Sequence, residues 1–367
     1  MGRDPGDQFP YAAFFWPAIA AASAVEAASS VAAQLLDLVP DTDDARTAQE
    51  PQGATPGKIA LELNSVHLRD FTTTDSGVAT LLCTPLALHG AAVADLAPGH
   101  SLVEALRSAG IERLFMADWR SASPDMRSLG IDEYLAALNV LVDDVGGRVD
   151  LVGLCQGGWL SLIYAARFPA KVRKIVMAGA PIDLAAQHCG LSAVAKATPL
   201  TVFQGLVNSG NGLVIGRSIA KFWGNPTDTK HIHEILQTAH PIGSPDFTQL
   251  EASFRKWNSW TIDVPGKYYL EVVEKLYKRN ELAHGSFVAL GQRIDLSRLR
   301  LPIYLLAGSA DDVVAPEQLL AAQRLVGTEP GALCHQVAPC NHLSLFMGRR
   351  TLEEYWPAIV RWINKVD

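Results

Sequence analysis

The stretch around Cys155 carries the strongest chemical signal in the chain. Cys155 lies between Gly153 and Gly157, after the apolar run 149–154 and before the amphipathic run 157–169. This spacing is typical of a nucleophile on a sharp strand-to-helix turn, because side chains two positions before or after it would collide with neighbouring backbone. The start of the helix would lower the pKa of the thiol and offer N–H groups to an oxyanion. The alternative is a buried structural cysteine beside helix-packing glycines.

Two later segments supply an acid and a base in the chain order that such a nucleophile requires, acid before histidine. Asp311 is the expected acid, and its neighbour Asp312 is the alternative. If Asp312 is not the acid, it is a solvated turn residue or a helix cap. His342 is the expected base, whereas His335 lies inside a strand pattern and is expected to be structural. In this arrangement His342 would deprotonate Cys155, and Asp311 would hold the tautomer of the imidazole.

Further residues are expected around the nucleophile. The oxyanion donors would be the backbone N–H of Gln156 and the backbone of Leu86 and Ala87, in the loop after the apolar run 78–86. His89 follows this loop and either lines the pocket or holds the loop in place. The candidate substrate contacts are His89, Trp159 and Trp260.

The elements that must position these residues alternate between strand and helix. Apolar or alternating runs indicate strands at residues 58–71, 78–86, 111–119, 149–154 and 172–183. Amphipathic runs with caps indicate helices at residues 101–110, 130–147 and 157–169. The alternation resumes at residues 301–314 and ends with one helix at residues 351–366. This order predicts the α/β class, with a mostly parallel sheet and helices on both faces.

The chain divides into four expected parts. They are an N-terminal apolar helix and linker (1–58), a first core part (59–184), a helical cap insertion (185–298) and a second core part (299–367). The insertion is mostly helical and rich in aromatic residues, which favours a cap over the carboxyl edge of the sheet. Such a cap would present an apolar face to an aliphatic substrate.

The first residues are apolar and rich in alanine. A signal peptide is disfavoured because Asp4 and Asp7 outweigh Arg3, and a spanning helix is disfavoured because Pro17 and Glu26 interrupt the apolar run. We expect a helix that packs on the main domain or on a partner. Contact with a hydrophobic surface, such as a polymer granule or a membrane interface, is the alternative.

Composition and missing motifs exclude several classes of function. The net charge of −7 argues against nucleic acid as a partner, because there is no basic surplus to neutralise phosphates. Five cysteines without a CxxC pair favour free thiols in a reducing compartment, hence a cytoplasmic protein. No GxGxxG or P-loop pattern occurs, and the pair His231 and His233 lacks a nearby third ligand. We therefore expect no cofactor and no metal site.

From Val78 to Trp362 the chain resembles the polyhydroxyalkanoate enzymes, a group of synthases and intracellular depolymerases. The segment "GLCQGGWLSLIYAARFPAKVRKIV" is similar to the synthase box, and "DLAPGHSLVEAL" and "FMADWR" also look like synthase segments. By contrast, "TPLALHGA", "GKYYLEVVEKLY" and "NHLSLFMGRR" are more like the oxyanion loop, a cap helix and the histidine loop of the depolymerases. The resemblance implies the α/β-hydrolase fold and a Cys-Asp-His triad, with a 3-hydroxyacyl thioester on Cys155.

The chain departs from both branches of the group. Gly157 stands where depolymerases usually have proline, "LALHGAA" replaces the usual synthase segment, and Asn341 replaces the glycine that commonly precedes the synthase histidine. Our first expectation is a Cys-dependent ester hydrolase acting on poly- or oligo-3-hydroxyalkanoate. The alternatives are a synthase-type acyltransferase that uses 3-hydroxyacyl-CoA, a non-catalytic granule-associated protein, and another thioesterase-like enzyme. The resemblance implies a polymer-granule surface as a partner, and is compatible with a homo-oligomer or a partner subunit.

Overall fold

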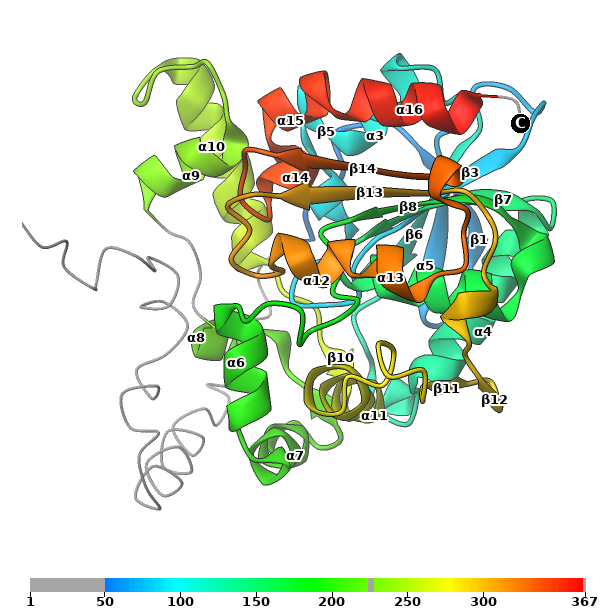
Figure 1. Cartoon of the computed structure of the whole chain (residues 1–367). Coiled ribbons are helices and arrows are strands. Elements are labelled where there is room, and N and C mark those ends of the chain that lie inside the picture. Colours follow the sequence, from blue (N-terminus) through cyan, green and yellow to red (C-terminus); the bar gives the residue numbers. More distant parts are fainter. Residues whose placement is uncertain (1–49, 224–227, 366–367) are drawn as a thin grey trace, which may run out of the picture.

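An eight-stranded sheet forms the centre of the protein (Figure 1). The computed structural model describes residues 50–223 and 228–365, so the expected N-terminal helix lies outside the described residues. The strands, in chain order, are β1 (Lys58–Glu62), β2 (Val66–Asp70), β3 (Ala79–Cys83), β6 (Leu114–Trp119), β7 (Val149–Leu154), β8 (Val172–Ala178), β13 (Ile303–Gly308) and β14 (Leu333–Ala338). Their order in space is β1-β2-β6-β3-β7-β8-β13-β14. Every pair of neighbouring strands from β6 to β14 is parallel. The two antiparallel pairs are β1 with β2 and β2 with β6.

Helices cover both faces of this sheet, as the alternating sequence pattern predicts (Figure 1). One face is covered by α4 (Ile131–Asp144), α5 (Gln156–Arg167), α12 (Pro316–Leu320) and α13 (Ala322–Leu325). The other face is covered by α3 (Leu102–Ser108), α14 (Ser344–Met347), α15 (Arg349–Glu354) and α16 (Trp356–Asn364). The inner strands β3, β6, β7, β8 and β13 are buried on both sides, which is why their sequences are mostly continuous apolar runs.

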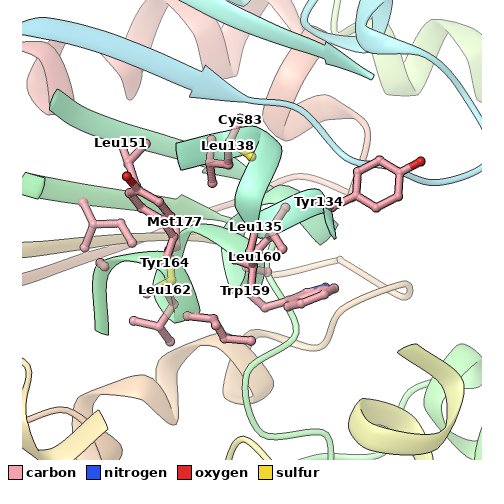
Figure 2. Close-up of a cluster of buried hydrophobic side chains, with 14 of the residues drawn as sticks. Cys83, Tyr134, Leu135, Leu138, Leu151, Trp159, Leu160, Leu162, Tyr164 and Met177 are labelled. Atoms are coloured by element: carbon pink, nitrogen blue, oxygen red, sulfur yellow. The ribbon is translucent and has the colours of Figure 1, made fainter. Parts of the chain in front are cut away.

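The core under α4 and α5 fixes the position of the turn at Cys155. Figure 2 shows Leu151 and Met177 of the sheet packed against Leu160 and Leu162 of α5. All four side chains are fully buried. Burial of each such side chain stabilises the fold by about 1.5–3 kcal/mol, so α5 is held firmly at the end of β7.

The inserted helices between β8 and β13 separate into two groups. The first group is α6 (Gly190–Ala197), α7 (Leu200–Ser209), α8 (Gly216–Trp223), α11 (Gly266–Glu271) and the π-helix η6 (Val272–Lys278); we call these the cap helices. The second group, α9 (Thr229–Leu236) and α10 (Pro245–Ser259), packs through Ile232, Phe254 and Trp257 into the same cluster as α3 and α16. We therefore propose that only the first group acts as a cap.

Four short strands complete the insertion, β9 (Leu213–Val214) with β10 (Val264–Pro265) and β11 (Val288–Ala289) with β12 (Gln292–Arg293). A further pair, β4 (Asp95–Ala97) with β5 (His100–Ser101), precedes α3. In the part of the chain that the structure describes, no helix is long and apolar enough to cross a bilayer.

Two expected elements are interrupted in the structure. The single strand expected at residues 58–71 is a hairpin, because the N–H of Leu63 donates to the carbonyl of Val66 across a tight turn at 2.9 Å. Asn64 and Ser65, both common in turns, occupy this turn. The single helix expected at residues 351–366 ends at Glu354, and α16 begins at Trp356 with Pro357 in its first turn. Proline there has no N–H for a continuous helix, so the chain begins a new one.

Candidate active site

Cys155 occupies a strained turn between β7 and α5. Its φ is 48° and its ψ is −116°, in the left-handed half of backbone space that a non-glycine residue rarely adopts. Such a conformation costs of order 1–3 kcal/mol. Two backbone hydrogen bonds hold it: the N–H of Cys155 donates to Ala178 and the N–H of Gly158 donates to Cys155, both at 2.9 Å. The turn therefore projects the half-buried thiol at the start of α5.

The glycines around Cys155 are required by close backbone contacts. A Cβ atom on Gly157 would collide with the carbonyl oxygens of Cys83 and Thr84 at the end of β3. A Cβ atom on Gly153 would collide with the backbone of Gly157 and Gly158. The steric reason predicted from the sequence is thus confirmed.

Replacement of Gly157 by alanine is therefore expected to destabilise the protein by about 1–3 kcal/mol or more, because the obstructing atoms are backbone and cannot move aside. Gly190 is the matched control, since a Cβ atom there meets nothing within 4 Å and its φ is not positive. Urea unfolding of Gly157→Ala and Gly190→Ala measures the difference. Equal stability of the two variants would contradict the steric argument.

His342 and Asp311 are hydrogen-bonded to each other at the carboxyl ends of the last two strands. Asp311 follows β13 and His342 follows β14, and the ring Nδ1 lies 2.7 Å from Asp311 Oδ2. The other carboxylate oxygen, Oδ1, accepts the N–H groups of Val313 and Val314 at 3.0 and 2.8 Å. Both carboxylate oxygens of Asp311 therefore have hydrogen-bond partners, and the Asp311 side chain has no exposed area.

The surroundings of His342 make its ring a stronger base. Burial alone would lower the pKa of His342, but the Asp311 carboxylate, the negative charge of Cys155 and hydrogen bonds to both raise it well above its ordinary value. Phe346 packs edge-on against the ring at 5.2 Å. The imidazole is therefore held between an acid on one side and the Cys155 thiol on the other.

The two neighbouring aspartates differ sharply in their partners. Asp312 points into a buried position where neither carboxylate oxygen has a hydrogen-bond partner among the described residues. Burial and the nearby Asp311 carboxylate raise the pKa of Asp312 to about 7. Of the two candidates that the sequence offered, Asp311 is the one that contacts His342.

Asp312 also predicts a pH effect on stability. Its pKa is raised on folding, so the unfolded state releases this proton first and the protein loses stability as pH rises from about 4 through about 7. Asp312→Asn carries no such charge and is expected to gain stability over the wild type above pH 7, by at most on the order of 4 kcal/mol, with little difference at pH 4. Thermal unfolding at both pH values tests this. A stability difference that does not change with pH would show that Asp312 titrates normally.

A cavity of about 240 Å³ opens above Cys155. Its floor is Cys155 and Gln156, and one wall is the loop of Leu86, Ala87 and Leu88. The cap helices close it with mostly hydrocarbon side chains: Leu191, Ala195, Phe203, Ile219, Val272 and Val273. The cavity thus suits an apolar chain whose reacting carbonyl lies at the thiol.

The residues predicted to bind an oxyanion line this cavity. Gln156 is the first residue of α5, where helix N–H groups have no acceptor within the helix. Its side-chain oxygen accepts the indole N–H of Trp159 at 2.6 Å, which fixes the amide. Across the cavity the loop of Leu86 and Ala87 is tied down at Leu88, whose carbonyl accepts the N–H of Ile262 at 3.1 Å. Both positions can offer N–H groups to one oxygen; their role as donors stays a prediction.

The three predicted substrate contacts are not among the residues that line the cavity. Trp159 is fully buried beneath Gln156. His89 stacks on Trp257 at 4.4 Å and its Nδ1 lies 2.8 Å from the carbonyl of Trp260, and burial lowers its pKa to about 4. His89 therefore ties the loop to the end of α10, which is the second of the two roles considered for it.

Three tyrosines of α11 and η6 line the cavity although they were not selected as site residues. They are Tyr268, Tyr269 and Tyr277. The sequence signal for them was the pair of adjacent tyrosines in "GKYYLEVVEKLY". Aromatic residues in a helix are more often core residues, so the pattern did not identify these tyrosines as part of the cavity. The packing of the cap helices shows that all three line it. Among the described residues, no group of three or more His, Cys, Asp and Glu side chains is placed to hold a metal ion.

Comparisons with known proteins show which proteins the chain is similar to. A family described as "PHB de-polymerase C-terminus" matches residues 227–367. The poly(3-hydroxyalkanoate) polymerase subunit PhaC of Haloferax mediterranei is 27% identical over 347 residues, which cover 90% of this chain and 68% of that protein. The PhaC subunit of Synechocystis is 28% identical over 289 residues, which cover 74% of each chain. The names of the two relatives favour the acyltransferase alternative over the hydrolase that we expected first.

Solved structures show the fold. A monoacylglycerol lipase of Paleococcus ferrophilus superposes with a TM-score of 0.54 at 18% identity, covering 81% of this chain and 98% of that one. An epoxide hydrolase of Bacillus megaterium gives a TM-score of 0.53 at 15% identity, covering 83% and 99%. They show the α/β-hydrolase fold, and the relatives above show that the chain is similar to polyhydroxyalkanoate polymerase subunits.

Proposed function

We propose that the chain is an acyltransferase of the polyhydroxyalkanoate synthase type. It would take 3-hydroxyacyl groups from coenzyme A thioesters and join them to the hydroxyl end of a growing polyester. The observation that carries this proposal is the similarity to a polymerase subunit over 90% of the chain. The site adds support, because a cysteine at the nucleophile position lies beneath an apolar cap that suits an aliphatic acyl chain.

In the first half of the reaction, Cys155 would become acylated. His342, held by Asp311, takes the thiol proton, and the sulfur attacks the thioester carbonyl. The N–H groups of Gln156 and of the loop at Leu86 and Ala87 stabilise the oxyanion. The carbon–sulfur bond to coenzyme A then breaks, and the leaving thiolate takes the proton from His342.

In the second half, a hydroxyl group would accept the acyl chain. His342 removes the proton of the hydroxyl at the end of the polymer, and its oxygen attacks the carbonyl of the thioester on Cys155. The new ester bond forms as Cys155 leaves, and the sulfur regains the proton from His342. An apolar cavity favours this acceptor over water, because water gains few hydrogen bonds from hydrocarbon walls.

The decisive experiment compares the two directions of the chemistry on the purified protein. With 3-hydroxybutyryl-CoA we expect release of free coenzyme A and growing turbidity from insoluble polymer. With amorphous polyhydroxybutyrate alone we expect little soluble 3-hydroxy acid. The reverse result would support the hydrolase expectation, to which the depolymerase name of the family matched at residues 227–367 also points.

A granule surface and a partner subunit are further proposals that follow from this function. The relatives are named as subunits, and a polymerase must stay at the surface of its insoluble product. Sedimentation with polymer granules tests the first point. A chain that sediments with granules but lacks activity in both assays would instead be a non-catalytic granule protein.

A further inference from the structure

Two tyrosine hydroxyls of the cavity wall are buried without a hydrogen-bond partner. They belong to Tyr268 and Tyr269, and neither hydroxyl has a partner among the described residues. A buried hydroxyl without a partner costs about 1–3 kcal/mol, so such groups call for an explanation. In a wall that is otherwise mostly hydrocarbon, a ligand with a polar atom at the right place would supply the partner.

Tyr268 is the tyrosine whose side chain packs toward the turn at the start of α5. Its ring packs edge-on against Tyr134 at 5.0 Å, and its side chain is only 2% exposed. Tyr134 in turn packs against Trp119 with 5.4 Å between the ring centroids. The indole N–H of Trp119 donates to the carbonyl of Thr84, which lies against Gly157 in that turn. Burial raises the pKa of Tyr268 well above its ordinary value, so its hydroxyl is neutral and can donate a hydrogen bond.

Tyr269 lies on a different wall. Its ring packs against Phe203 of α7 with 6.1 Å between the ring centroids. Burial raises its pKa, so this hydroxyl is neutral too. Its packing leads to the cap helix α7 rather than to the turn at Cys155.

A 3-hydroxyacyl group carries an oxygen two carbons beyond its reacting carbonyl. We propose that Tyr268 donates a hydrogen bond to this oxygen and so makes the site select 3-hydroxyacyl groups over unsubstituted acyl groups. The inference rests on the proposed function. An acyl group without the oxygen leaves Tyr268 unpartnered, and sites built to bind a substrate hydroxyl discriminate on this basis.

The test measures the acylation of Cys155 in a single turnover, as coenzyme A released per enzyme, with 3-hydroxybutyryl-CoA and with butyryl-CoA. For Tyr268→Phe we expect about a tenfold slower reaction with 3-hydroxybutyryl-CoA and an unchanged reaction with butyryl-CoA. Removing an unpartnered hydroxyl does not harm the free protein, so its unfolding temperature should stay equal or rise.

Tyr134→Phe is the matched control. Its hydroxyl is also buried without a partner among the described residues, but Tyr134 belongs to α4 and is not among the residues that line the cavity. It should leave both rates unchanged. Tyr269→Phe, which changes the wall at α7, should alter the selectivity less than Tyr268→Phe.

Three results would overturn the inference. Equal slowing of both substrates by Tyr268→Phe would indicate a packing role, and unchanged rates would indicate none. A larger loss of selectivity in Tyr269→Phe would move the contact to that residue. If the wild type releases coenzyme A from neither thioester, the proposed function fails instead, and this result is distinct because it does not depend on Tyr268.

Discussion

Replacement of Cys155 by alanine is expected to abolish the release of coenzyme A from 3-hydroxybutyryl-CoA, with a loss of at least about 10³-fold. The whole covalent route passes through the sulfur, and no other group at the floor of the cavity is a nucleophile of this kind. In the wild type, mass spectrometry of the peptide that contains Cys155 should show one added 3-hydroxybutyryl group after a brief reaction. The variant should show none.

Cys334→Ala is the control for this experiment. Cys334 is a free, half-buried thiol on the edge strand β14, so it tests whether loss of any accessible thiol lowers activity. It should retain full activity and normal acylation of Cys155. Full activity in Cys155→Ala would refute the assignment of the nucleophile and leave a granule-binding role as the better explanation.

Replacement of Asp311 by asparagine is expected to lower the rate of acylation by about 10²–10⁴-fold without unfolding the protein. The amide oxygen can keep the hydrogen bonds from Val313 and Val314, so the amide NH₂ must face Nδ1 of His342. A donor at that position forces the ring hydrogen onto Nε2, and the imidazole can then no longer accept the thiol proton. Loss of the negative charge also lowers the pKa of His342, so the pH dependence should shift toward lower pH.

Asp312→Asn is the matched control, because it changes the adjacent carboxylate, which has no hydrogen-bond partner among the described residues. We expect near-normal rates in this variant between pH 6 and pH 9. Pre-steady-state release of coenzyme A by both variants across this pH range makes the comparison. If Asp312→Asn were the inactive variant, the alternative acid considered from the sequence would be the correct one.

Local sequence signals predicted the parts of this protein that depend on neighbouring residues. The Gly-x-Cys-x-Gly pattern predicted the turn at Cys155, and the structure has it with a φ of 48°. The alternation of apolar and amphipathic runs predicted a mostly parallel sheet covered on both faces. These predictions succeed because turn sterics and side-chain periodicity act within a few residues.

The boundaries of some elements needed the structure. The hairpin at residues 58–71 and the break near Tyr355 lie inside patterns that were interpreted as single elements. A turn at Asn64 or a break before Pro357 interrupts an apolar pattern only slightly. The position of the turn is set by the pairing of β1 with β2, and the start of α16 is set by its packing on the sheet.

The sequence by itself determined the turn at Cys155, the order of the candidate cysteine, acid and histidine, and the class of the fold. Only the tertiary structure showed that Asp311 rather than Asp312 contacts His342, placed His89 and Trp159 outside the cavity lining, and brought Tyr268 into it. The reason is that a side chain's partner depends on segments far apart in the chain. Asp311 and His342 meet because β13 and β14 end at the same edge of the sheet, and Tyr268 reaches the cavity because the cap folds back over that edge.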